Sequence, residues 1–252
     1  MAQIFKPSAN SITAVTLLSV AIGVPTVWMA IAALSRSPAN TKVNVPLNQP
    51  IPFSHQHHVA ELGIDCRYCH TSVEKSAYPG LPPTETCMSC HSQIWTNSPL
   101  LEPIRQSYET GTPIRWNQVN KLPDFAHFNH SIHIARGLSC NICHGPIQNM
   151  QITMKGNEFQ MAWCLQCHRA PERYLYKDKL APAGQTPAQQ VFGLYWKFQK
   201  TGLSGLTQRE QDIMLGNYKG EDDAESKSKG KDFIHTYGVK VAQLADCSVC
   251  HY

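Results

Sequence analysis

Charged side chains are scarce in this chain of 252 residues, because Asp, Glu, Lys and Arg together make up 16% of it, whereas about 25% is usual for a soluble domain. The 22 basic residues outnumber the 18 acidic ones by only four, and they form no basic stripe along the sequence. A protein that binds nucleic acid concentrates positive charge on one face. We therefore expect no nucleic-acid partner.

Long apolar periodic runs are also few beyond residue 36. The sequence does not show the alternation of strands and helices that would indicate a parallel α/β fold. Such a chain cannot build a large apolar core from its own side chains. We therefore expect a mainly helical and irregular fold, in which short helices and coil wrap around bound apolar groups.

Cysteine, by contrast, is abundant and regularly spaced. The ten cysteines form five pairs with two residues between partners, and a histidine follows each pair. C-x-x-C-H is the attachment signature of c-type haem: two thiols one turn apart reach the porphyrin vinyl groups, and the histidine binds the iron. The attachment pairs are Cys66 and Cys69, Cys87 and Cys90, Cys140 and Cys143, Cys164 and Cys167, and Cys247 and Cys250; the predicted proximal iron ligands are His70, His91, His144, His168 and His251.

Other uses of paired cysteines explain this pattern poorly. In a zinc ribbon, two C-x-x-C pairs together bind one metal ion, and no histidine is needed after each pair. Thioredoxin-like motifs occur singly and near a βαβ unit. The sequence therefore predicts five covalently bound c-type haems, within a multihaem cytochrome c of short helices and coil that carries one N-terminal transmembrane helix.

A second histidine pattern repeats within the chain. Residues Phe53–His58 and Phe128–His133 both read F-x-H-x-x-H, and each precedes two haem motifs, so the chain contains a duplicated module. Histidines three positions apart lie on one side of a helical turn, and their rings can diverge toward two irons. Bis-histidine ligation fills both axial positions. The predicted distal iron ligands are His55, His58, His130 and His133.

The fifth iron needs a distal ligand from elsewhere. Met161 and Met150 flank the fourth motif, and a thioether ligand raises the potential of a haem. We favour Met161 or Met150 over His235 for this position, although methionine more often fills gaps in a core. His57 and His127 are expected to be packing or surface residues.

The N-terminal segment reads as a membrane anchor. Residues 7–35 carry no charge and lie between Lys6 and Arg36. The stretch Ile12–Leu34 would span about 34 Å as a helix, enough to cross a bilayer, with a kink expected at Pro25. A cleaved signal peptide ending near Ala32 is the alternative, but the apolar run exceeds a usual signal core, so we predict a retained anchor.

The sequence as a whole suggests a chain of five parts. They are residues 1–36, the anchor; 37–52, a proline-rich tether; 53–106, the first dihaem module; 107–175, a linker with the second dihaem module; and 176–252, an insertion with the fifth haem segment. Within the last part, residues 188–198 predict a helix with Val191, Tyr195 and Phe198 on one face. Thr207 and Glu210 predict a capping box for a short helix that stops near Gly216. The charged stretch 220–231 predicts a mobile or partner-ordered loop.

The twin modules resemble those of cytochromes c3 and c7. Residues 53–74, 86–95 and 163–169 more closely resemble the pentahaem cytochrome subunit of alternative complex III, and the likeness covers residues 1 to about 175 and the last motif. It implies an electron-transfer wire that is not an enzyme on its own, within a quinol:electron-acceptor oxidoreductase. The implied partners are an iron–sulfur subunit related to molybdopterin enzymes, polytopic quinol-site subunits, a monohaem cytochrome c, and a periplasmic acceptor or terminal oxidase. Because c-type haem is assembled outside the bacterial cytoplasmic membrane, we expect the haem part on the periplasmic side.

Two other function classes remain open. A membrane-anchored quinol dehydrogenase of the NapC/NirT type also has one N-terminal helix and several C-x-x-C-H motifs, and it would oxidise quinol itself, but that family does not show the duplicated F-x-H-x-x-H pattern. A catalytic multihaem reductase needs an open iron position. This chain offers at least as many distal donors as irons, so nothing in the sequence demands an open position.

Overall fold

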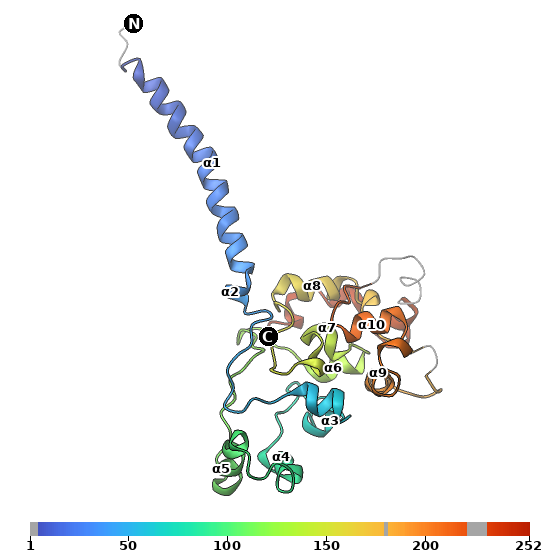
Figure 1. The fold of residues 1–252 in the computed structure, drawn as a ribbon. Helices are drawn as coiled ribbons and strands as arrows, with labels where there is room; N and C mark the ends of the chain where they lie inside the picture. The colour runs from blue at the N-terminus through green and yellow to red at the C-terminus, as the bar shows by residue number, and fades with distance from the viewer. Residues whose placement is uncertain (1–4, 179–180, 221–230) are drawn as a thin grey trace. The chain divides into compact units, whose positions relative to one another are not determined.

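The computed structural model describes residues 5–178, 181–220 and 231–252. The chain divides into two compact units, Met1–Val43 and Asn44–Tyr252, and Figure 1 traces both. Most of the charged stretch predicted as a mobile loop, residues 221–230, lies outside the described residues.

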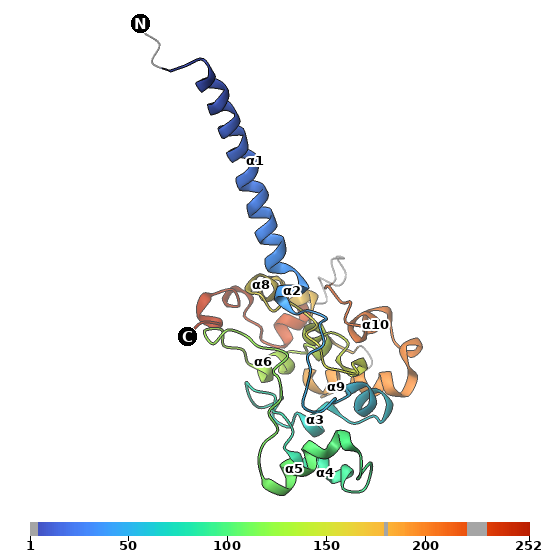
Figure 2. The same ribbon diagram turned by 60° about the vertical axis from the view of Figure 1, so that its left-hand side comes forward.

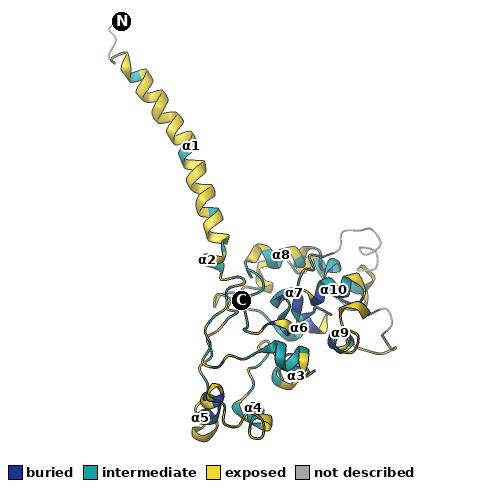
Figure 3. Ribbon diagram, viewed as in Figure 1, coloured by how far each residue is buried: buried dark blue, intermediate teal, exposed yellow. Residues whose placement is uncertain are grey.

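The first unit is built on one long apolar helix. Helix α1 (Ser8–Arg36) has 29 residues, none of them buried, and it is long and apolar enough to cross a membrane; Figure 3 shows its exposed surface. Pro25 lies inside the helix, and the Thr26 hydroxyl donates to the Ile22 carbonyl at 2.7 Å. The short helix α2 (Pro38–Thr41) follows. A helix of this kind serves as an anchor or as a signal sequence.

The second unit confirms the predicted fold class. Its described residues hold short helices and irregular chain without a β-sheet, and the strand-like pairing is an isolated bridge between Pro46 and Met154. The α-helices are α3 (Cys66–Cys69), α4 (Thr84–His91), α5 (Glu102–Thr110), α6 (His130–Ala135), α7 (Cys140–His144), α8 (Met161–Arg169), α9 (Pro187–Thr201) and α10 (Gln208–Met214). The unit also contains a π-helix, η1 (Gln56–Glu61), and the 3₁₀-helices η2 (Pro99–Leu101), η3 (Ile147–Asn149), η4 (Pro171–Arg173), η5 (Leu203–Gly205), η6 (Val241–Gln243) and η7 (Cys247–Val249). Residues 231–236 are helical as well.

Helices α9 and α10 form an apolar core made by the protein alone, which the sparse apolar pattern did not lead us to expect. The largest buried cluster comprises Tyr176, Val191, Leu194, Tyr195, Leu206, Ile213 and Met214, with Phe198 packed against it. The predicted helix face of Val191, Tyr195 and Phe198 is therefore confirmed. Cys140 of the third motif also packs on this cluster, so the core adjoins a haem motif.

The predicted capping box of the following helix is confirmed as well. The Thr207 hydroxyl accepts from the Glu210 N–H, and the Glu210 carboxylate accepts from the Thr207 N–H. Helix α10 ends at Met214, and Gly216 then adopts a φ of 71°. A Cβ at Gly216 would lie 2.6 Å from Cδ of Pro146. Glycine is therefore required here by both conformation and space.

Residues 44–52, in the stretch predicted as a tether, are fastened along the second unit. The Asn44 N–H donates to the Lys155 carbonyl at 2.9 Å. The Gln49 side chain exchanges two hydrogen bonds with the Asn117 backbone, at 2.8 and 2.9 Å. Ile51 is buried with Leu101 and Ile104. This stretch is extended but is not a free linker.

Candidate haem-binding sites

The cysteine pairs lie on single helical turns. Four pairs lie in helices α3, α4, α7 and α8; in the fifth pair, Cys247 begins η7 and Cys250 follows its last residue. In the first motif the Asp65 side chain accepts from the Arg67 N–H and caps the turn. No three His, Cys, Asp or Glu side chains converge on a common point in the described ranges. The spacing within each pair is the one that attachment along a porphyrin edge requires.

Each predicted distal histidine faces one predicted proximal histidine. An iron bound to two imidazoles at about 2 Å from each nitrogen places the ring centroids roughly 6.3 Å apart, because each nitrogen lies about 1.1 Å from its ring centre. The centroid separations are 6.5 Å for His55 and His70, 6.2 Å for His58 and His91, 6.3 Å for His130 and His144, and 6.1 Å for His133 and His168. These four spaces fit a haem iron held between two histidines.

Hydrogen bonds turn the same nitrogen of most candidate ligands toward the protein. Because a carbonyl oxygen can only accept, a ring that bonds one through Nδ1 carries its proton there and keeps the Nε2 lone pair for metal. Nδ1 donates to a carbonyl at 2.7–3.2 Å in His58, His70, His91, His130, His133, His168 and His251. His55 Nδ1 lies 3.0 Å from the Thr153 hydroxyl.

Burial favours the neutral, metal-binding form of these imidazoles. It lowers the pKa of His55 to about 4, with the nearby rings of His70 and His58 adding to the effect. It likewise lowers the pKa of His144 to about 4. The pKa of His133 is also lowered, chiefly by burial. These rings need not lose a proton before they bind a metal near neutral pH.

The phenylalanine of each F-x-H-x-x-H module packs on the histidines of its own module. It stacks on the second histidine and meets the first edge-on, so it fixes the two rings nearly at right angles. The centroid distances are 4.6 Å for Phe53 and His58, 5.0 Å for Phe53 and His55, 4.3 Å for Phe128 and His133, and 4.7 Å for Phe128 and His130. The two modules therefore repeat the same arrangement of rings as well as the same sequence pattern. The local backbone differs, because the histidine pair of the first module lies on the π-helix η1, with His55 at its N-cap, and the pair of the second module lies on α6.

The other histidines have different surroundings. His57 Nδ1 lies 2.9 Å from a Glu61 carboxylate oxygen, and its ring stacks on Trp95. His127 is exposed and stacks on Tyr252 at 4.4 Å. His235 is exposed. None of these three has a ring contact with a motif histidine among the described residues.

The two methionines predicted for the fifth iron differ in their surroundings. Met150 is 5% exposed, and its sulfur accepts from the Met154 N–H at 3.5 Å. Met161 is 67% exposed at the start of α8. The ring of the fifth proximal histidine, His251, lies beside Phe125, with the two centroids 5.9 Å apart.

The surroundings of the thiols show which motifs are neighbours. Burial raises the pKa of the thiols of Cys66, Cys69, Cys143 and Cys164, and for Cys143 the pKa reaches about 12. A nearby thiol of another motif adds to each rise: Cys140 acts on Cys66, Cys87 on Cys69, Cys167 on Cys143 and Cys250 on Cys164. The first motif therefore lies near the second and third, and the fourth lies near the third and fifth.

Paired cysteines, each pair followed by a histidine, and a mainly helical, irregular fold are typical of multihaem cytochromes c, which bind c-type haem. Residues 126–189, which contain the second module, match the family model of cytochrome c7 and related cytochromes c. Over 97 residues the chain is 36% identical to the multihaem cytochrome c subunit of menaquinone reductase from Nitratidesulfovibrio vulgaris strain Hildenborough. The match covers 38% of this chain and 45% of that relative, so it spans less than half of the relative's length.

Proposed function

We propose that the chain carries five c-type haems and transfers electrons within a membrane-bound quinol:electron-acceptor oxidoreductase. The observation that supports this most is the facing of four pairs of histidine rings, 6.1 to 6.5 Å apart, beside four cysteine pairs. In each site the two cysteines would hold the porphyrin through their thiols, and the two histidines would ligate its iron. Haem bound in this way supplies an iron that gains and loses one electron.

Filled axial positions favour electron transfer over catalysis. A reductase must leave one iron position open for its substrate, whereas a pair of facing rings such as His130 and His144 would ligate a haem iron from both sides. The backbone carbonyls that hold Nδ1 keep these rings in place, so little rearrangement accompanies a change of charge. The chain is therefore proposed as an electron-transfer subunit, not as an enzyme on its own.

The proposed setting is the periplasmic face of a bacterial cytoplasmic membrane, with α1 retained as a single-pass anchor. The relative named as a menaquinone reductase subunit supports a place in a quinone-linked complex. The partners we propose are an iron–sulfur subunit related to molybdopterin enzymes, polytopic quinol-site subunits, a monohaem cytochrome c, and a periplasmic acceptor or terminal oxidase. We assign the quinol chemistry to the polytopic subunits, as the resemblance to alternative complex III implies.

The name of that relative favours a second candidate, in which electrons run the other way. The chain would then accept electrons from a periplasmic donor and deliver them toward menaquinone. Reduction of one quinone to quinol takes two electrons and two protons, so the chain would pass two electrons for each quinone. Both candidates use the same haem sites and differ in donor and acceptor.

Purification of the intact complex tests the proposal. The chain is purified from membranes in mild detergent through a tag at its N-terminus, its companion subunits are identified by mass spectrometry, and haem is counted by pyridine haemochrome. We expect five haems per chain and reduction of these haems by added quinol. Oxidation of the pre-reduced haems by menaquinone, without reduction by quinol, would favour the second candidate. Fewer than five haems, or quinol oxidation by the chain alone, would contradict the proposal.

A further inference from the structure

The order of the haem sites in space can be inferred from the contacts between their motifs. We propose that the sites form one row in the order second, first, third, fourth, fifth. The first site, not the second, then joins the two modules, and the second and fifth sites are the two ends at which electrons enter or leave. This inference rests on the proposed binding of five haems and deepens it.

The second site adjoins the first. The Tyr68 hydroxyl lies 2.8 Å from the Ser89 hydroxyl, and both residues stand between the two cysteines of their own motifs. His55 and His58, which face His70 and His91, lie on the same turn of chain. Thr84 of α4 lies 2.7 Å from the Ser107 hydroxyl of α5, but among the described residues no hydrogen bond or ring contact joins α4 to residues 126–175. Figures 1 and 2 agree that α4 lies on the far side of α3 from α8.

The first and third sites interlock by a reciprocal exchange. His130, which faces the third motif, donates from Nδ1 to the Ala77 carbonyl at 2.8 Å, and Ala77 follows the first motif. His55, which faces the first motif, lies 3.0 Å from the Thr153 hydroxyl, and Thr153 follows the third motif. Each module thus positions the first distal histidine of the other. This exchange fixes the two sites as neighbours.

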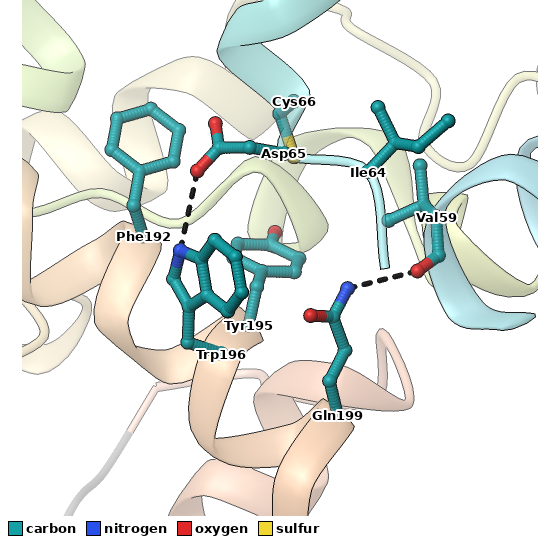
Figure 4. A pocket seen from close by; sticks show the side chains of 8 residues that line it. All are labelled: Val59, Ile64, Asp65, Cys66, Phe192, Tyr195, Trp196 and Gln199. Atoms are coloured by element: carbon teal, nitrogen blue, oxygen red, sulfur yellow. Dashed lines mark hydrogen bonds between the residues drawn. The ribbon is translucent and has the colours of Figure 1, made fainter. Parts of the chain in front are cut away.

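Helix α9 contacts both the first and the third motif. The Phe192 ring lies 4.3 Å from the Arg67 guanidinium carbon in the first motif. The Tyr195 hydroxyl donates to the Asn141 side chain in the third motif at 2.7 Å. Figure 4 shows Trp196 and Gln199 of the same helix hydrogen-bonded to Asp65 and Val59, both of which precede Cys66 in the chain. One helix therefore sets the spacing of the two modules.

The remaining sites continue from the third. Phe159 lies between the His144 ring, 5.8 Å away, and the Trp163 ring, 5.3 Å away, and so links the third motif to α8 of the fourth. The fourth proximal histidine, His168, donates to the Leu244 carbonyl at 2.8 Å, just ahead of the fifth motif. The fifth site contacts the region before the second module, because His251 Nδ1 donates to the Phe125 carbonyl.

Removing one haem attachment site at a time distinguishes the proposed order of sites from an order that follows the sequence. Two variants of the full chain are prepared, one with Cys87→Ala and Cys90→Ala, the other with Cys66→Ala and Cys69→Ala. Low-spin ferric haems that are close neighbours couple magnetically, so removing one alters the electron paramagnetic resonance signals of its neighbours. In the proposed row, loss of the second site changes one remaining signal and loss of the first changes two. A row in sequence order reverses these numbers and would overturn the inference.

A second measurement needs no variant. Iron positions in a density map of the intact haem-loaded complex should place the first iron between the second and the third. A map with the second iron between the first and the third would overturn the order. Because the unmodified chain is counted for haem first, a count below five refutes the proposed function, whereas a count of five with another order refutes this inference alone.

Discussion

At the scale of single residues, the sequence predicts the side chains that would bind the metal, but it does not predict the atoms that orient those side chains. The cysteines and histidines could be predicted because their chemistry and spacing are written in the sequence. The orienting atoms could not, because the Gly80, Ala77 and Leu244 acceptors are backbone carbonyls, which every residue possesses. Long-range folding alone selects them.

Replacement of His130 by alanine should convert one low-spin haem to high-spin, because the imidazole facing His144 is lost while both cysteines remain. His127→Ala is the matched control, since its ring stacks on Tyr252 instead. Electron paramagnetic resonance of the oxidised protein measures the high-spin signal. An unchanged spin state in the His130 variant, or a new high-spin signal in the His127 variant, would refute the ligand assignment.

Gly156 is required by a close approach of chain segments. A Cβ there would lie 2.4 Å from the carbonyl carbon and oxygen of His144, so Gly156→Ala must displace the third proximal ligand. We expect a loss of about 1–3 kcal/mol of stability, as for an overpacked core, together with a disturbed spin state at one haem. Gly193→Ala is the control, since its Cβ meets nothing within 4 Å, and alanine in helix α9 should add about 0.5–1 kcal/mol. Denaturant titration compares the two variants, and equal stability would contradict the steric argument.

At the scale of elements, local signals predicted α9 and α10 well because each carries its own caps and apolar face. The capping boxes of Thr186 and Thr207 begin these helices without help from distant residues. The π-helical form of η1 had no such signal. Its two histidines read like those of α6, and the difference arises from tertiary contacts such as the Gln56 N–H donating to the Met150 carbonyl.

Helix α10 holds a buried carboxylate whose partners should make stability depend on acid pH. Glu210 is 4% exposed and accepts from Lys197 at 2.7 Å and from the Tyr176 hydroxyl at 2.8 Å. Burial by itself would raise the pKa of Glu210, but the hydrogen bonds from Lys197, Thr207 and Tyr176 outweigh it and lower the pKa. The stabilisation is therefore complete above the ordinary pKa of glutamate, about 4.3, and is lost as pH falls through the lowered value.

The variant Glu210→Gln should be less stable than the parent protein by about 1–3 kcal/mol at pH 7, since a hydrogen-bonded group loses its charge. The deficit should shrink as pH falls below about 4, where the parent carboxylate is protonated as well. Urea unfolding at a series of pH values measures the difference. Glu109→Gln, at an exposed position of α5, should leave stability nearly unchanged, and a deficit independent of pH at Glu210 would contradict the argument.

At the scale of the whole molecule, the sequence predicted one apolar N-terminal helix and a haem-rich remainder, and the structure divides at residue 43. The order of the sites in space could not be predicted, because the spacing of the motifs along the chain does not determine which motifs are neighbours in the folded protein. The reciprocal contacts of His55 and His130 decide that order. They join residues 98 and 53 positions apart, beyond the reach of any local pattern.

The N-terminal helix provides the last prediction. If α1 is a retained anchor, the intact mass of the chain purified from membranes should include residues 8–36, and the chain should resist extraction by alkaline carbonate. Val20→Arg places a charge near the middle of α1, at a cost of about 2.5–3.5 kcal/mol for insertion, and should reduce the membrane-bound fraction. Ser8→Arg, at the first residue of α1, is the matched control, because a charge at a helix end can reach the interface. A mature chain that begins after Ala32 would instead identify α1 as a cleaved signal sequence, and the haem-bearing unit would then depend on its partners for attachment to the membrane.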